Sequence, residues 1–127
     1  MNSTLRLSSD QLESAAEFLK NGELVAFPTE TVYGLGAQIF LSDAIEKIFK
    51  VKGRPADNPL IVHACTIEQI EQVAQRIPDL FFTLADHFFP GPLTIVLKRN
   101  PQVPAIVSAG LDTVAVRIPS HLLARKL

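Results

Sequence analysis

The chain has 127 residues, a length typical of a single domain. Apolar residues make up 47% and charged residues 20% of it, which is the composition of a globular protein and excludes intrinsic disorder. The formal net charge of −1 excludes a broad basic surface as the main source of affinity, so we do not expect tight non-specific binding of nucleic acid.

Cysteine content and hydropathy indicate a protein of a reducing compartment. Cys65 is the single cysteine, which excludes an internal disulfide, and the Cys/His spacing of a zinc site is absent from the sequence. The first residues lack the apolar stretch of a signal peptide, and no run approaches the roughly 18 apolar residues of a membrane span. We therefore expect a cytoplasmic protein that does not enter a membrane.

Apolar periodicity predicts a helix and then a strand at the start of the chain. Over 10–20 the apolar residues lie three and four positions apart, and Asp10 with Glu13 resembles a capping box. The apolar run 24–27 is closed by a proline and predicts a buried strand. The segment 29–37 follows as a loop that contains two glycines.

A second helix and a second strand are predicted before the middle of the chain. Ser42 is a candidate cap for a helix that ends before Gly53, and its buried face is expected to hold Ile45, Ile48 and Phe49. The apolar run 60–64 predicts another buried strand.

The second half of the chain continues the alternation of helices and strands. The clearest helix covers 66–77, with Thr66 as its cap, and another follows over 79–88. The remaining expected elements are a turn at 90–92, strands at 93–97 and 113–118, and the first turns of a helix at 120–127.

This alternation predicts an α/β fold in which part of the sheet is parallel, because separated strands need crossover connections. Ligands of such folds usually bind at the carboxyl ends of strands. The functional site is therefore expected in the loops after Phe27, Val62 and Val116.

The loop after the first strand offers two hydroxyls, a carboxylate and a phenol, and its glycines allow a ligand to approach the backbone. Glu30 is the acid best placed for metal or proton chemistry. The alternative is an ordinary exit from a strand, with threonines as local caps.

Four cations, Lys47, Lys50, Lys52 and Arg54, lie within eight residues around the end of the second helix. Cations there complement the dipole of a helix C-terminus. Alternatively they clamp phosphate, since arginine binds two phosphate oxygens and lysine adds a point charge. The residue pattern leaves both interpretations open.

His63 lies in or at the end of one predicted strand, and Arg117 lies at the end of another, just before a proline. A lone histidine in a strand is more often a satisfied core residue, but a neutral imidazole also orients substrates and accepts protons near neutral pH. An arginine at a strand end commonly pairs with a carboxylate, from the protein or from a ligand. His87 and His121 are interpreted as a helix-surface and a helix-start residue.

Two further patterns are given a purely structural interpretation. Pro90-Gly91-Pro92 is expected to form a rigid turn with no chemical role. The phenylalanines at 81, 82, 88 and 89 are expected to pack in the core or on a packing surface, and not to stack on nucleic-acid bases.

Five segments form a pattern that is weak in each segment and specific in combination. They are 27–35, 52–55, 58–60 with His63, 90–94 and 114–119. In this order they resemble the YrdC-like family, the threonylcarbamoyl-AMP synthases. The resemblance implies a twisted mixed sheet with flanking helices.

The resemblance also implies an activity. Members of the family make threonylcarbamoyl-AMP and pyrophosphate from L-threonine, bicarbonate and ATP, with Mg²⁺, and a downstream transferase moves the threonylcarbamoyl group to an adenosine of tRNA. Carried over, the resemblance assigns Thr31, His63 and Arg117 to threonine. It assigns Lys52 and Arg54 to the ATP phosphates and to catalysis, and Asn58 and Thr113 to the nucleotide.

The sequence departs from the family in one respect. The family has a further nucleotide-binding segment of Ser-x-Asn type downstream of the arginine strand, and that segment is missing here. We therefore expect residues 1–127 to be one YrdC-like domain that is truncated at its C-terminal side. Alternatives are a non-catalytic module that binds RNA or nucleotide, a carbamoyl-transfer relative with another substrate, and an inactive truncated relative.

Overall fold

The computed structural model of the chain describes residues 4–53, 55 and 59–127. Its first part contains a short 3-10 helix, an α-helix, a pair of strands and another α-helix. In chain order these elements are η1 (Ser9–Gln11), α1 (Leu12–Lys20), β1 (Val25–Pro28), β2 (Tyr33–Gly36) and α2 (Ser42–Lys52).

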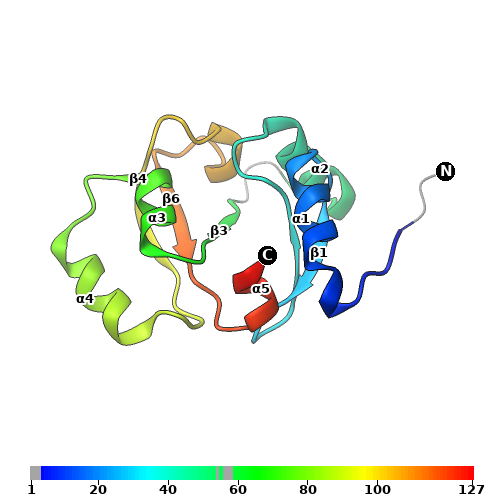
Figure 1. Ribbon diagram of the computed structural model, residues 1–127. Coiled ribbons are helices and arrows are strands. Elements are labelled where there is room, and N and C mark those ends of the chain that lie inside the picture. Colours follow the sequence, from blue (N-terminus) through cyan, green and yellow to red (C-terminus); the bar gives the residue numbers. More distant parts are fainter. Residues whose placement is uncertain (1–3, 54, 56–58) are drawn as a thin grey trace.

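The second part supplies a sheet with its covering helices. Its elements are β3 (Ile61–His63), α3 (Ile67–Val73), β4 (Ala74–Gln75), α4 (Asp79–Phe88), β5 (Ile95–Arg99), η2 (Ala105–Ser108), β6 (Thr113–Arg117) and α5 (Leu122–Lys126). In Figure 1, α1, α2 and β1 lie on one side of the molecule and the sheet with α3 and α4 lies on the other. Helix α5 lies between them, and it contacts β1.

The predicted first helix is confirmed as η1 followed by α1, but its capping box lies two residues earlier than expected. The side chain of Gln11 accepts a hydrogen bond from the backbone N–H of Ser8 at 2.8 Å, which is the returning half of a Ser8–Gln11 box. The box expected at Asp10 and Glu13 is therefore wrong. Ser8 is the last residue with an extended backbone, and its polar side chain sets where the helix begins.

Strands β1 and β2 pair antiparallel in a two-stranded sheet of their own. The expected loop is therefore wrong over Tyr33–Gly36, which forms β2. Glycines hid this strand from sequence analysis because they weaken strand propensity. Gly36 is required by packing, since a Cβ there would lie 2.7 Å from the Phe27 ring. Strand β1 is less buried than expected, because Ala26 is exposed.

Helix α2 follows its prediction, and Ile45, Ile48 and Phe49 are buried as expected. Its N-cap is Leu41 rather than Ser42, so the start differs by one residue. The helix ends where Gly53 adopts a left-handed backbone with φ of 62°, a conformation that glycine takes without strain.

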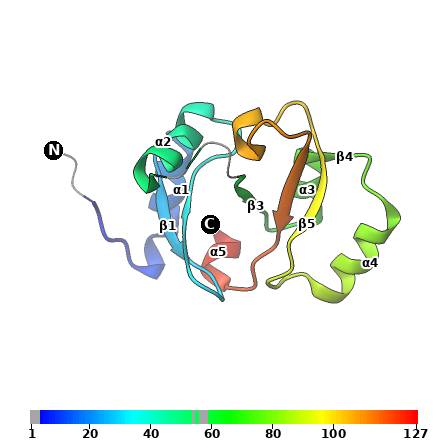
Figure 2. The same ribbon diagram turned by 180° about the vertical axis from the view of Figure 1, so that it is seen from behind.

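The larger sheet has the order β3-β6-β5-β4. Strands β3 and β6 are parallel, and β5 pairs antiparallel with both β6 and β4. The expected α/β class with a twisted mixed sheet and flanking helices is confirmed. Figure 2 shows β5 beside β6 from behind. The strand predicted at 93–97 begins and ends two residues later, at Ile95–Arg99.

Helix α3 is shorter than the predicted 66–77. Thr66 caps it as expected, and its hydroxyl accepts from the N–H of Gln69 at 3.2 Å. The chain then leaves the helix, and Ala74–Gln75 pairs with β5 at the edge of the sheet. The apolar residues keep a helical spacing as far as Ile77, but pairing with β5 ends the helix before that point. Helix α4 has the predicted bounds.

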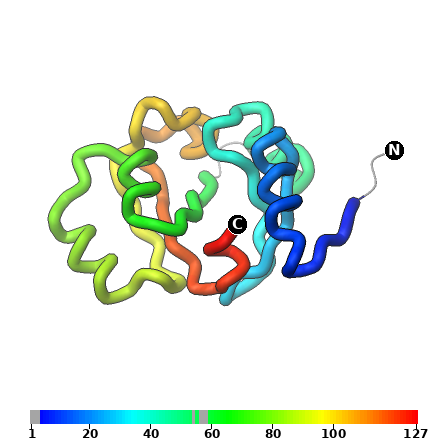
Figure 3. The backbone as a smooth tube through the Cα atoms, viewed as in Figure 1, coloured from blue at the N-terminus to red at the C-terminus, as the bar shows by residue number. Residues whose placement is uncertain are grey.

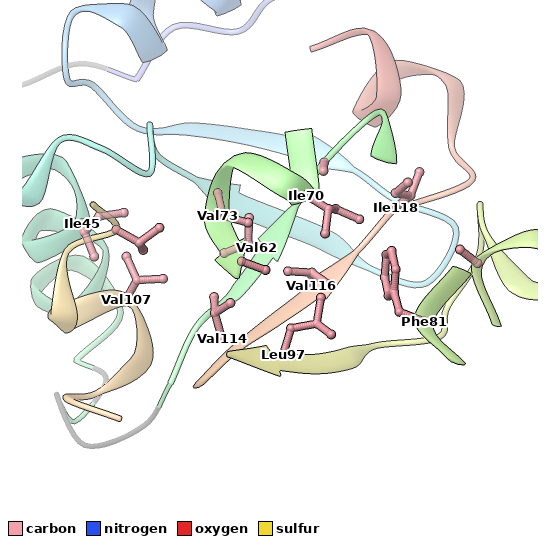
Figure 4. Packing of buried hydrophobic residues seen from close by; sticks show 14 of the residues in the cluster. Ile45, Val62, Ile70, Val73, Phe81, Leu97, Val107, Val114, Val116 and Ile118 are labelled. Atoms are coloured by element: carbon pink, nitrogen blue, oxygen red, sulfur yellow. The ribbon is translucent and has the colours of Figure 1, made fainter. Parts of the chain in front are cut away.

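One face of the sheet carries the hydrophobic core, which Figure 4 shows from close by. Phe81 is only 1% exposed, and its ring meets those of Phe82 and Phe89 edge-on at centroid distances of 5.2 and 6.1 Å. The predicted packing role is confirmed for Phe81, Phe82 and Phe89, whereas Phe88 is 54% exposed. The core cluster includes Val62, Ile70, Val73, Phe81, Leu97, Val114 and Val116.

The opposite face of the sheet carries the alternate residues of each strand. Strand alternation and register place Ile61, His63, Val96, Lys98, Thr113, Ala115 and Arg117 there. Figure 3 shows the C-terminal end of the chain near the middle of the molecule, between the β1–β2 hairpin and the sheet. In the part of the chain that the structure describes, no helix has the length and apolar character needed to cross a bilayer.

Candidate functional site

Three loops that are distant in sequence meet at one end of the sheet. His63 and Arg117 are the last residues of the parallel strands β3 and β6, and they are register neighbours. The ring of Phe27, near the end of β1, meets the His63 ring edge-on at 5.8 Å between centroids. The three loops named from the carboxyl-end rule therefore lie together, although β1 belongs to a strand pair separate from the sheet.

Arg117 is buried, with 8% of its surface exposed, and two separate loops hold its guanidinium. Its Nε donates a hydrogen bond to the carbonyl oxygen of Gly91 at 3.0 Å. Its Nη2 donates to Glu30 Oε1 in an ion pair. Burial lowers the pKa of Arg117 from its ordinary value, and arginine nevertheless stays protonated in proteins.

Glu30 is the carboxylate partner that sequence analysis had left open between protein and ligand. One of its oxygens accepts from Arg117, and the other accepts from the backbone N–H of Ser120 at 3.1 Å. Its side chain is 22% exposed. Glu30 thus fastens the turn between β1 and β2 to the segment that follows β6.

The Pro90-Gly91-Pro92 turn does more than the rigid turn that was expected. The Gly91 N–H donates to the carbonyl of Ile118 at 2.8 Å, and the Gly91 carbonyl receives Arg117. A Cβ at Gly91 would lie 2.7 Å from the backbone oxygen of Phe88, so only glycine fits there without a shift. A glycine held between two prolines was the sequence signal for this role.

His63 presents a buried nitrogen without a partner. Within residues 4–53, 55 and 59–127, its Nδ1 is the buried side-chain polar atom that makes no hydrogen bond. Burial lowers the pKa of His63, so the imidazole is neutral at pH 7. Of the two interpretations left open, a satisfied core histidine would need a partner for Nδ1, and the described residues supply none. A buried polar atom of this kind is suited to a ligand contact.

Thr31 lies in the hairpin turn, directly after Glu30. Its hydroxyl lies 3.1 Å from that of Thr29, whose Oγ1 also accepts from the Thr31 N–H at 3.2 Å. The Thr31 side chain is exposed. The turn brings the Glu30 carboxylate to Arg117, and Thr31 is the next residue along it.

The residues predicted to bind nucleotide are not gathered in the same way. Thr113 begins β6 whereas Arg117 ends it, which separates them by about 13 Å at the usual strand rise. Lys52 is exposed at the end of α2. Arg54 and Asn58 lie outside the described residues. Lys47 is held by Gly22 O at 3.0 Å and by Glu23 at 3.5 Å, so it has a structural partner.

The other two histidines have the structural roles that were predicted. His87 lies on the surface of α4, with its Nδ1 2.8 Å from the carbonyl oxygen of Thr83. His121 caps α5 and accepts from the N–H of Leu123 at 3.1 Å.

Comparison with known proteins defines the family. The Sua5/YciO/YrdC model, which carries the description "telomere recombination", matches residues 17–127. The chain belongs to this family. The YrdC-like resemblance expected from the five segments is thereby confirmed.

Two family members named threonylcarbamoyl-AMP synthase illustrate the similarity. The protein of Pyrococcus abyssi is 52% identical over 122 residues, and that of Bacillus subtilis is 48% identical over 124 residues. The alignments cover 96% and 97% of this chain and 36% of each relative. The chain thus spans about a third of the length of these family members.

Solved structures of the family show the same fold. The crystal structure of Pyrococcus abyssi Sua5 complexed with L-threonine matches with a TM-score of 0.91 at 52% identity, over 96% of this chain and 36% of that one. The solution structure of MTH1692 from Methanobacterium thermoautotrophicum matches with a TM-score of 0.74 at 31% identity, over 99% of this chain and 60% of that one.

Proposed function

We propose that this chain is the substrate-binding domain of an L-threonylcarbamoyladenylate synthase, which makes threonylcarbamoyl-AMP and pyrophosphate from L-threonine, bicarbonate and ATP. One observation carries the proposal: the unpartnered Nδ1 of His63 lies on the strand that neighbours the one bearing the Arg117 guanidinium. The names of the relatives and the L-threonine in the Pyrococcus abyssi structure support the choice of substrate.

Threonine binds, in this proposal, at the edge formed by Thr31, His63 and Arg117. Arg117 anchors the carboxylate, because guanidinium and carboxylate form charge-assisted hydrogen bonds. His63 stays neutral and offers its free nitrogen to a polar group of the amino acid. Thr31 adds a hydroxyl from the hairpin turn.

ATP binds, in this proposal, through Lys52, Arg54, Asn58 and Thr113. Lys52 and Arg54 act on the phosphates and are the catalytic residues, since cations that face developing phosphate charge lower the barrier to its transfer. Thr113 contributes from the same sheet face as His63 and Arg117. Lys98 is its register neighbour on that face.

The chemistry requires positioning rather than a covalent intermediate with the protein. The amine of threonine and bicarbonate form a carbamate with loss of water. A carbamate oxygen then attacks the α-phosphorus of ATP, and pyrophosphate leaves. Holding the two substrates in this geometry converts an encounter in solution into a reaction within one complex.

The remaining assignments belong to the same proposal. Mg²⁺ enters on the ATP phosphates, as it commonly does with one or two protein carboxylates at most. Residues 1–127 act as one YrdC-like domain, consistent with a core cluster that joins Ile45 of α2 to Val107 and the sheet. The product passes to a tRNA threonylcarbamoyl transferase in the cytoplasm, and contact with tRNA accompanies this transfer.

Calorimetric titration of the chain with L-threonine and with ATP tests the binding roles. We expect Lys52→Ala to weaken ATP binding by about tenfold, the loss typical of one charge-assisted contact. Lys47→Ala is the matched control on the same helix, and it should leave ATP binding unchanged because Lys47 pairs with Glu23.

Pyrophosphate release with L-threonine, bicarbonate and ATP tests the activity. Binding of both substrates without release would make this chain a binding module and refute catalysis by it. Equal ATP affinities of the Lys52→Ala and Lys47→Ala variants would refute the assignment of Lys52.

A further inference from the structure

A single carboxylate joins the hairpin turn to the end of β6. Glu30 lies in the turn between β1 and β2, 87 positions from Arg117 in sequence. Both of its oxygens are engaged, one by the Arg117 guanidinium and one by the Ser120 N–H at 3.1 Å. Displacing Glu30 would therefore break both contacts between the hairpin turn and the segment around the end of β6.

The contacts of Arg117 fix the plane of its guanidinium. Nε is held by the carbonyl of Gly91 at 3.0 Å, and Nη2 is held by Glu30. Two anchors from separate loops leave the planar group little freedom to rotate. Among the described residues Nη1 has no hydrogen-bond partner, so its two N–H groups are available to an incoming carboxylate.

We propose that Glu30 is a positioning residue that holds Arg117 in the orientation needed to bind the carboxylate of the amino-acid substrate. This role rests on the proposed function, which assigns threonine to Arg117. Glu30 acts through the guanidinium and does not itself touch the substrate carboxylate. Its charge also makes the pair neutral overall, so the substrate carboxylate is selected by directed N–H groups rather than by net positive charge.

A competing arrangement has Glu30 occupying the place of the substrate carboxylate and being displaced by it. The two arrangements predict opposite effects of Glu30 on threonine affinity. A positioning carboxylate strengthens threonine binding, whereas a competing one weakens it. Removal of the Glu30 charge therefore separates them.

The test uses Glu30→Gln and Glu30→Asp in the whole 127-residue chain, with Glu17→Gln as the matched control. Glu17 is an exposed carboxylate that pairs with Lys20 on the surface of α1. Threonine and ATP affinities are measured by calorimetry, and the Nε–Hε resonance of Arg117 is followed by NMR. Thermal melts identify any variant that fails to fold.

We expect Glu30→Gln to weaken threonine binding by about tenfold or more, as loss of a charge-assisted contact predicts, with ATP affinity unchanged. Glu30→Asp keeps the charge and should restore part of the threonine affinity. It also serves as the test if the Gln variant does not fold. The Arg117 Hε resonance should exchange faster with solvent in Glu30→Gln than in Glu17→Gln.

Unchanged or tighter threonine binding in both Glu30 variants would overturn the positioning role while leaving the proposed function intact. Absence of threonine binding by the unsubstituted chain would overturn the proposed function and this role together. An equal loss of threonine and ATP affinity would show a general structural defect and would also overturn the positioning role.

Discussion

The ion pair between buried Arg117 and the partly exposed Glu30 should stabilise the region around the site. Arg117→Met replaces the guanidinium by an unbranched apolar side chain and leaves Glu30 with only the Ser120 N–H among its described contacts. Breaking a fully buried pair costs about 3–5 kcal/mol. Because the Glu30 side chain is 22% exposed, water offsets part of this, and we expect a loss of about 2–3 kcal/mol.

Thermal and urea denaturation at pH 7 measure this loss. For a domain of this size 1 kcal/mol corresponds to about 3–5 °C in Tm, so the midpoint should fall by roughly 6–15 °C. The double variant Arg117→Met/Glu30→Gln contains no unpaired buried charge. It should therefore be more stable than the sum of the single losses predicts, by about 1–2 kcal/mol.

A second double-mutant cycle, on the surface pair Lys20 and Glu17, supplies the control. That pair lies 3.6 Å apart with side chains 70% and 66% exposed, and its coupling should stay below about 0.5 kcal/mol. If the coupling between Arg117 and Glu30 is no larger than that of the surface pair, the argument from burial is refuted.

Two further predictions concern the neighbours of this ion pair. Gly91→Ala places a Cβ against the Phe88 carbonyl and should destabilise the chain by about 1–3 kcal/mol in urea denaturation, with an altered Arg117 Hε resonance; an unchanged spectrum would contradict the role of the turn. His63 takes up its proton at a lower pH in the folded chain than in the unfolded chain, whose ordinary pKa is 6.5. The contribution of His63 to the free energy of unfolding is therefore fully present above pH 6.5 and declines as the pH falls below that value. Unfolding measured between pH 7 and pH 5 should show a smaller decline in His63→Gln, and equal declines would refute the effect of burial.

Sequence alone predicted the elements in which local pattern and tertiary packing agree. Helix α4 and strand β6 have a clear apolar pattern and were found at their expected places. The meeting of the loops after β3 and β6 was also predictable, because parallel strands bring their carboxyl ends to one edge. The loop after β1 joins them although β1 belongs to a separate antiparallel pair. Strand β2 was missed because its glycines serve packing against Phe27, and β4 was missed because edge pairing ended a helical pattern.

The partners within the site were beyond sequence analysis. Arg117 was expected to meet a carboxylate and Glu30 was noted as a useful acid, but their positions 87 apart gave no indication that they pair. The Gly91 carbonyl was missed because backbone acceptors carry no sequence signature. The unpartnered nitrogen of His63 depends on the packing around it, which residue type does not encode.

The β1–β2 hairpin forms a ladder separate from the four-stranded sheet, which has an energetic consequence. No backbone ladder joins the two among the described residues, so side chains such as Glu30 and Phe27 carry the attachment. Opening of the hairpin away from the sheet then breaks those side-chain contacts and leaves both ladders intact. A ligand that contacts both the hairpin and the sheet adds its binding free energy to the free energy needed to open the hairpin. We therefore expect a ligand at the proposed site to make residues 25–36 locally more rigid.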